Sequence, residues 1–170
     1  MGRLFVVMVR LREPEDVRLC VEVLAGVHDQ DGYPLQWPAD PVSWLSPPGL
    51  VSAWVADVDG ELAGHVALIG DNSSELPPGL GQAEISRLFV SPTMRGRGVG
   101  AQLLDAVTRR AEHQGWALWL EVVEGRGSAA PFYERRGWRL VDRRSADWTT
   151  SAGDRPVLRR YAEPSQPKYP

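Results

Sequence analysis

Six consecutive residues, Arg95-Gly96-Arg97-Gly98-Val99-Gly100, combine small side chains with two positive charges. Glycine lets a backbone come close to a ligand. The residues from Val99 onward have helical spacing, and the first N–H groups of a helix have no partner within it, so that end attracts anions. Positions 97 to 99 offer no Ser, Thr, Asp or Asn to cap these groups. The segment therefore predicts a phosphate or pyrophosphate site, with a plain glycine turn as the alternative.

Two common nucleotide motifs fit this segment poorly. A P-loop needs Lys-Ser or Lys-Thr after its last glycine, and Ala101-Gln102 provides neither. The dinucleotide fingerprint G-x-G-x-x-A is met in spacing by Gly96, Gly98 and Ala101, and Glu121 stands where a ribose-binding acid is expected. Residues 91–95, however, separate the first glycine from the preceding strand. A dinucleotide-binding protein is thus kept as a minor alternative.

Composition sets the limits for any function. The chain has 170 residues, 43% apolar and 24% charged, which suits one globular domain, predicted over residues 1–162 with a flexible tail at 163–170. A net charge of -3 with interspersed signs predicts neither a nucleic-acid nor a membrane partner. The single Cys20 indicates a buried thiol in a reducing compartment, and no signal or membrane-spanning segment is predicted, which favours a cytoplasmic protein. Three scattered histidines and one cysteine predict no metal site.

Two strands and a helix must position the glycine segment. Alternation predicts a strand over 84–90, with Glu84, Ser86, Leu88 and Val90 on one face and Ile85, Arg87 and Phe89 on the other. A helix is predicted from Val99 to the stop at Gly115, followed by a strand over 117–123. A strand, helix and strand in this order predict parallel neighbours with the loop at the carboxyl edge of the sheet, where ligands bind.

The remaining elements are predicted by local signals. They are a strand over 4–9, a helix from Pro14 to Val27, an irregular segment over 28–50 with a helical turn near 41–45, a hairpin of strands 52–58 and 61–69 around Asp59-Gly60, a short helix between the N-cap Ser128 and Gly137, and antiparallel closing strands over 138–143 and 157–161.

Two separated motifs carry a family resemblance. The sequence Val90-x-Pro92-x-x-Arg95-Gly96-x-Gly98-x-Gly100 resembles the R/Q-x-x-G-x-G/A signature of the GNAT superfamily of acetyl-coenzyme A-dependent N-acetyltransferases. The later Leu120-x-Val122 and Ala129-x-x-Phe132-Tyr133-x-x-x-Gly137-Trp138 are similar to a second motif of that family. Arg126 stands where many members have an asparagine that contacts the cofactor, so that contact is not carried over.

The resemblance implies a fold and a cosubstrate. The fold would be a single α/β domain of the α+β type, with a mixed central sheet splayed between the parallel strands 84–90 and 117–123 and flanked by helices. Acetyl-coenzyme A (acetyl-CoA) would be the cosubstrate. Its contacts would be the backbone groups of Leu88, Phe89 and Val90 for the pantetheine arm, the N–H groups of Arg95, Gly96, Arg97, Gly98, Val99 and Gly100 for the pyrophosphate, and Ser128.

The resemblance also implies direct attack of an amine on the acetyl thioester. Tyr133 matches the general acid of the family, and its phenol, with a pKa near 10 against about 8.5 for a thiol, suits a hydrogen-bond donor better than a strong acid. The alternative is a core residue beside Phe132. Glu84 is the predicted base, working through water, with a solvated strand-end acid as its alternative. His65, on the strand after the hairpin turn, is a third candidate for a catalytic residue, with a structural or surface-exposed histidine as its alternative.

The resemblance also implies that the acceptor binds to the variable N-terminal region, here residues 29–45. Tyr33, Trp37 and Trp44 could stack on it or only seal the sheet, and Asp29, Asp31 and Asp40 could meet a cation. This predicts a small-molecule amine or an amino-acid derivative as the acceptor. A protein N-terminus or lysine, a non-catalytic acetyl-CoA sensor and a homodimer stay open.

Overall fold

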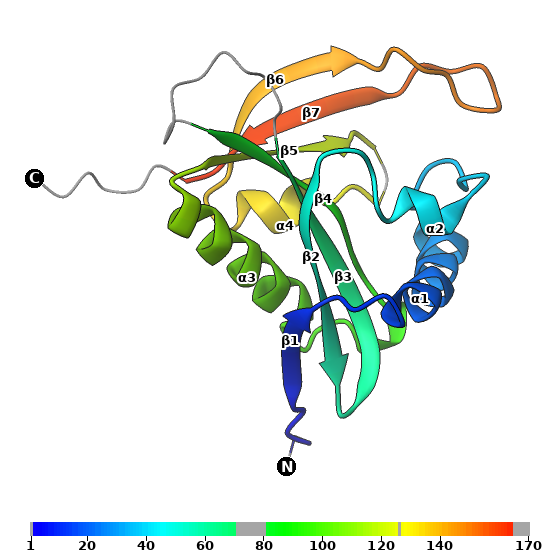
Figure 1. Cartoon of the computed structure of the whole chain (residues 1–170). Helices are drawn as coiled ribbons and strands as arrows, with labels where there is room; N and C mark the ends of the chain where they lie inside the picture. Colours follow the sequence, from blue (N-terminus) through cyan, green and yellow to red (C-terminus); the bar gives the residue numbers. More distant parts are fainter. Residues whose placement is uncertain (1, 71–80, 126, 165–170) are drawn as a thin grey trace, which may run out of the picture.

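A seven-stranded sheet with the order β1-β2-β3-β4-β5-β7-β6 runs through the computed structural model (Figure 1). The structure describes residues 2–70, 81–125 and 127–164. All neighbouring strands are antiparallel except β4 and β5, so the predicted mixed sheet is confirmed. The strands are β1 (Val7–Leu11), β2 (Leu50–Val58), β3 (Glu61–Gly70), β4 (Gln82–Val90), β5 (Ala117–Val123), β6 (Arg139–Ser145) and β7 (Val157–Ala162).

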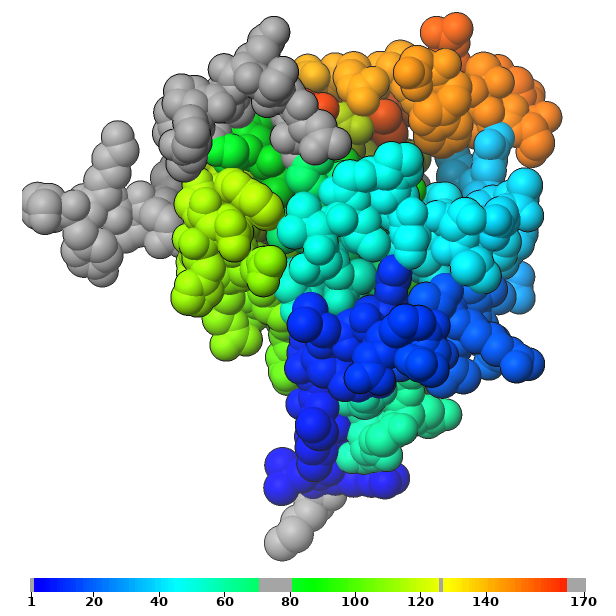
Figure 2. All heavy atoms as spheres, in the orientation of Figure 1, coloured from blue at the N-terminus to red at the C-terminus, as the bar shows by residue number. Residues whose placement is uncertain are grey.

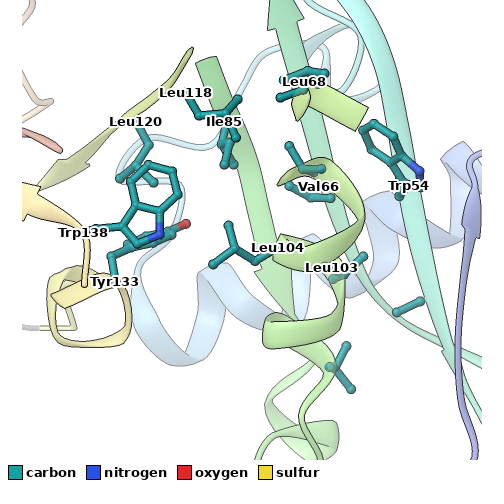
Figure 3. Close-up of a cluster of buried hydrophobic side chains, with 14 of the residues drawn as sticks. Trp54, Val66, Leu68, Ile85, Leu103, Leu104, Leu118, Leu120, Tyr133 and Trp138 are labelled. Atoms are coloured by element: carbon teal, nitrogen blue, oxygen red, sulfur yellow. The ribbon is translucent and has the colours of Figure 1, made fainter. Parts of the chain in front are cut away.

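Helices cover both faces of the sheet (Figure 1). They are α1 (Asp16–Asp31), α2 (Pro41–Trp44), the 3-10 helix η1 (Pro92–Met94), α3 (Val99–Gln114) and α4 (Ala130–Glu134). On one face α3 and α4 pack over a large apolar core that includes Leu103, Val107 and Tyr133 (Figure 3). On the other face α1 packs over a smaller core with the fully buried Cys20 and Leu24. No helix in the described part of the chain is long and apolar enough to cross a membrane.

Several local predictions are confirmed. Asp59 and Gly60 have φ of 51° and 85°, as the predicted two-residue hairpin requires. Gly115 ends α3 in the left-handed conformation, and β5 has the predicted bounds. Close approach of α3 to the sheet depends on Gly64, because a Cβ there would lie 3.0 Å from Leu103 Cδ1 and 3.2 Å from Val99 Cγ1 of this helix.

Two predicted boundaries near the N-terminus are wrong. The first strand is Val7–Leu11, and Leu4 is 94% exposed, because the partner strand β2 ends opposite Val7 and then turns. Helix α1 continues to Asp31, past the predicted end at Val27, and ends at Gly32, which is left-handed and donates its N–H to the His28 carbonyl.

A β-bulge in β4 overturns the predicted faces of that strand. One extra residue of β4 lies opposite β3 between the pairs His65–Phe89 and Ala67–Ser86, and Arg87 has a φ of 52°. The bulge reverses the alternation, so Leu88 packs on the α3 side with Ile85, and Phe89 packs on the α1 side. Glu84 therefore does not share a face with Leu88 and Val90.

The sheet splays where it was predicted to. β4 pairs with β5 only from Gln82 to Glu84, and from Ile85 onward the two strands diverge. β7 fills the other side of β5 over Trp119–Val123. Beyond β7, Glu163 still exchanges hydrogen bonds with Leu118, while residues 165–170 of the predicted tail and residues 71–80 of the connection before β4 lie outside the described residues.

Candidate functional site

A pocket of about 910 Å³ occupies the opening between β4 and β5. Its walls come from the end of α1, the second half of β4, the start of α3, the second half of β5, α4 and the loop between β6 and β7. The predicted site residues that line it are Tyr33, Leu88, Phe89, Val90, Arg95, Gly96, Gly98, Val99, Gly100, Ser128 and Tyr133. The pocket thus joins the glycine segment to the candidate proton donor.

The glycine segment lines the pocket at the start of α3. Gly96 and Gly98 have φ of 75° and 77°, and a Cβ at either would meet no atom within 4 Å. Gly98 is the N-cap residue of α3 and supplies no side-chain hydrogen bond, so the first N–H groups of this helix are available to a ligand. The prediction that no side chain caps this helix is confirmed.

The two arginines of the segment point in different directions. Arg95 lines the pocket and forms an ion pair with Asp31 at the end of α1. Arg97 does not line it, because its guanidinium lies over the Phe5 ring, 3.9 Å from the centroid, and contacts the Met94 sulfur at 2.9 Å. Only the backbone of Arg97 is left for the predicted phosphate contact.

Tyr133 stands in the wall opposite the glycine segment, on α4. Its ring is 4% exposed and packs edge-on against Phe132 and Trp138, with centroids 5.1 Å and 5.9 Å away. In Figure 3 its hydroxyl points away from α4. Within the described residues this hydroxyl has no hydrogen-bond partner, although every fully buried side-chain N or O atom has one, so it opens onto the pocket. Burial raises the pKa of Tyr133 above its ordinary value, which keeps the phenol protonated.

Of the three aromatic residues predicted to bind the acceptor, Tyr33 alone lines the pocket. Burial of its phenol raises its pKa to about 12, even though 36% of the residue is exposed. Trp37 packs instead against His28, with ring centroids 5.4 Å apart. Trp44 lies beneath the guanidinium of Arg87 at 4.6 Å.

The two predicted bases are not in the pocket wall. Glu84 lies at the narrow end of the opening, where β4 still pairs with β5, and burial raises its pKa. His65 is fully buried between Arg12, whose Nη1 donates to Nε2 at 2.9 Å, and the Arg87 carbonyl, which accepts from Nδ1 at 2.9 Å. Burial lowers the pKa of His65 to about 4, so it is neutral, and its ring stacks on that of Phe89 with centroids 5.2 Å apart.

The three predicted acidic contacts also differ in their surroundings. Asp31 lines the pocket but is paired with Arg95. Asp40 caps α2 by accepting hydrogen bonds from the N–H and hydroxyl of Ser43, and Asp29 is exposed. Arg126, which stands where many family members have a cofactor-contacting asparagine, lies outside the described residues.

Two parts of the pocket wall were not predicted from the sequence. Arg87 enters the pocket because of the bulge, and Thr150, Asp154 and Pro156 enter it from the β6–β7 loop. The Gln36 side chain donates a hydrogen bond to the Thr149 carbonyl at 2.9 Å, which ties this loop to the α1–α2 connection. Figure 2 shows these two segments, cyan and orange, against each other. The sequence carries no signal for contacts between segments so far apart.

Two glutamates of the wall are paired with arginines. Glu121 pairs with Arg144 and Arg160 at 3.1 Å and 2.9 Å, so it is not available as a ribose-binding acid. Glu124 pairs with Arg143 and Arg159 at 2.7 Å and 3.1 Å, and its pKa is lowered chiefly by hydrogen bonds from these arginines. Over residues 2–70, 81–125 and 127–164, no group of three or more His, Cys, Asp or Glu side chains could hold a metal ion.

Comparisons with known proteins agree with this geometry. The family model "Acetyltransferase (GNAT) family" matches residues 20–138. Peptidyl-lysine N-acetyltransferase YiaC from Escherichia coli is 30% identical over 89 residues, 52% of this chain and 51% of that protein. The chain spans about half the length of the curated relatives it matches.

Solved structures share the fold over nearly the whole chain. The ribosomal-protein-S18-alanine N-acetyltransferase from Escherichia coli has a TM-score of 0.70 at 19% identity, covering 97% of this chain and 99% of that one. Arabidopsis thaliana NAA60 in complex with acetyl-CoA has a TM-score of 0.70 at 18% identity, covering 92% and 97%. Since the family model matches well over half of the sequence and includes both the glycine segment and Tyr133, this chain belongs to the acetyltransferase (GNAT) family.

Proposed function

We propose that this protein transfers the acetyl group of acetyl-CoA directly to the primary amine of a small molecule or an amino-acid derivative. The observation that carries the proposal is the single pocket that runs from the uncapped start of α3 to the hydroxyl of Tyr133. One end of it suits a pyrophosphate and the other a departing thiolate.

The residues present fit acetyl-CoA as cosubstrate. The left-handed Gly96 and Gly98 leave open space for phosphate oxygens, and N–H groups from Arg95 to Gly100 would hold them. The backbone of Leu88 to Val90 would pair with the pantetheine arm, and Ser128 would add a polar contact at the far wall. Bound there, acetyl-CoA supplies the activated acetyl thioester.

Tyr133 would act on the leaving group. Its phenol stays protonated in the dry wall, so it can donate a hydrogen bond to the sulfur as negative charge develops there. Glu84 would take the proton of the amine through water, because its carboxyl is not part of the pocket wall. Its raised pKa makes it a stronger base than an ordinary carboxylate.

A small acceptor is supported by the bridge between Gln36 and Thr149. This hydrogen bond joins the two loops beside the acceptor end, where Tyr33 and Thr150 line the wall. A chain that passed between these two loops would have to break it. An acceptor held by a single end does not, so small amines and chain termini fit better than a lysine within a folded protein.

Release of the coenzyme A thiol from acetyl-CoA tests the proposal. The panel should contain free amino acids, simple alkylamines, N-terminal peptides and lysine-containing peptides, the last two because relatives are named for such acceptors. We expect fastest release with small amines. Tight acetyl-CoA binding without release for any acceptor would instead indicate a sensor, and nicotinamide dinucleotide binding in place of acetyl-CoA would indicate a dinucleotide-binding protein.

A further inference from the structure

We infer that Arg87 binds a carboxylate of the acceptor, so that the acceptor is a small molecule carrying both a primary amine and a carboxylate. This inference rests on the proposed acetyl transfer and narrows its substrate class. Arg87 lines the pocket from the bulge of β4, on the side of the strand that faces α1 and α2.

Arg87 forms no ion pair with the described residues. No carboxylate there lies within ion-pair distance of its guanidinium, whereas Asp31, Glu121 and Glu124 in the same wall are all paired with other arginines. Burial lowers the pKa of Arg87, and the charges of Tyr33 and Glu84 oppose this shift only in part. A half-buried charge without an ion-pair partner is costly, so an anion that arrives with the substrate would be favoured.

Arg87 differs from the other arginines of the pocket wall in its burial and its lack of an ion-pair partner. Arg135 and Arg136 also line the pocket, but both are exposed and their charges are hydrated. Arg95 is engaged with Asp31 beside the glycine segment. Arg87 is half-buried and is held away from that segment, on the acceptor side.

The guanidinium of Arg87 is also held in place before any ligand arrives. Its Nε donates to the Trp44 carbonyl at 3.0 Å, its Nη1 donates to the Ser86 hydroxyl at 2.7 Å, and its plane lies over the Trp44 ring. Nη2 makes no hydrogen bond to the described residues. A fixed guanidinium with free N–H groups matches the geometry of a carboxylate.

Tyr33 and Tyr133 line the same pocket as Arg87. An acceptor whose amine lies near Tyr133 and whose carboxylate lies near Arg87 would therefore lie within this one pocket.

The experiment compares acceptors that differ in their carboxylate alone. Free L-amino acids are paired with their carboxamides, and ω-amino acids with alkylamines of equal length. Thiol release gives kcat/KM, and calorimetry on the protein saturated with coenzyme A gives Kd for the acceptor. We expect the carboxylate member of the preferred pair to have a kcat/KM about 10- to 100-fold higher and a Kd lower by a similar factor. This is the difference that one hydrogen bond between charged groups usually makes.

Variants of Arg87 assign the preference to this residue. Arg87→Gln should remove it, lowering kcat/KM for the acid and changing that for the amide little, while Arg87→Lys should keep part of it. Gln or Lys at position 87 would have to adopt the same positive φ that Arg87 has, so the backbone strain is the same in all three proteins. Arg144→Gln, which removes a nearby arginine that already pairs with Glu121, is the matched control and should leave the preference intact.

Several results would overturn the inference: equal rates and affinities within every wild-type pair, an equal loss for both members in Arg87→Gln, or a C-terminally blocked peptide that exceeds every free amino acid. The wild-type comparison needs no variant, so it decides even if Arg87→Gln fails to fold. A carboxylate preference in Kd without thiol release from any acceptor would support the Arg87 site and contradict the proposed transfer reaction.

Discussion

At the scale of single residues, the candidate site residues divide into those that are available to a substrate and those that are already bound to other parts of the protein. Tyr133 has a free hydroxyl, and Arg87 has free N–H groups within the described residues. His65, Trp37 and Asp40 have the right chemistry but are occupied by protein partners. Availability, and not residue type, distinguishes the two groups.

Tyr133→Phe should lower kcat by about 10- to 1,000-fold, because one hydrogen bond to the developing thiolate is lost. The Kd for acetyl-CoA should stay the same. Steady-state kinetics and calorimetry give the two values. Tyr161→Phe is the control: it also removes a hydroxyl from the core, one bonded to Glu134 at 2.6 Å, but Tyr161 does not line the pocket. Full turnover in Tyr133→Phe would contradict the assigned role.

Glu84→Gln should change the pH dependence of catalysis. A base must be deprotonated, so kcat/KM should rise with pH through the raised pKa of Glu84, and this acidic limb should disappear in the glutamine variant. Glu163→Gln is the matched control, because burial also raises the pKa of Glu163, which is bonded to Leu118 away from the pocket. If the Glu84→Gln and wild-type profiles coincide, Glu84 is not the base.

At the scale of elements, what the sequence predicts well is local. The hairpin at Asp59-Gly60, the start and end of α3 and the bounds of β5 depend on neighbours in the chain, and all were predicted. The bulge at Arg87 depends on the register between β4 and β3, which no stretch of β4 encodes alone. Trp37 and Trp44 could not be told from Tyr33 by type, because the fold decides which aromatic ring faces the pocket.

The start of α3 allows a test at this scale. Gly98→Ala places a Cβ on a residue with φ of 77° and should cost about 1–2 kcal/mol of stability. Any shift of the backbone also misplaces the N–H groups, so the Kd for acetyl-CoA should rise by about 10-fold or more. Gly60→Ala introduces the same strain, with φ of 85° and equally open space, in the β2–β3 turn. It should lower the melting temperature and leave Kd unchanged, whereas equal Kd values in both variants would argue against a phosphate site.

At the scale of the whole molecule, an ion-pair cluster joins the first strand to the first helix. Arg10 donates two hydrogen bonds to Asp16, at 2.8 Å and 2.9 Å, and one to Asp57 of β2 at 3.0 Å. Asp16 is 7% exposed and also accepts from the N–H of Glu13. The cluster holds α1, and with it one wall of the pocket, against the sheet.

Asp16 should make stability depend on pH. The hydrogen bonds from Arg10 hold its pKa below the ordinary value, so its contribution is present above the unfolded pKa of about 4 and is lost as pH falls through the folded pKa. Asp16→Asn should therefore reduce the free energy of unfolding at neutral pH by about 1–3 kcal/mol, and the difference from wild type should shrink in acid. Urea unfolding at several pH values measures it, with the exposed Asp105→Asn as control. A difference that does not vary with pH would exclude this linkage.

The divergence of β4 from β5 leaves an unpaired strand edge inside the molecule. Strand edges of this kind usually lie at the outside of a sheet, where they can recruit another chain. A ligand that binds along this edge must bring its own amide donors and acceptors, and the pantetheine arm of acetyl-CoA has both. Bound there, the arm would pair with β4 as a short additional strand that is not protein. Amide hydrogens from Ile85 to Val90 that face β5 should thus exchange quickly in the free protein and slow down when coenzyme A is added.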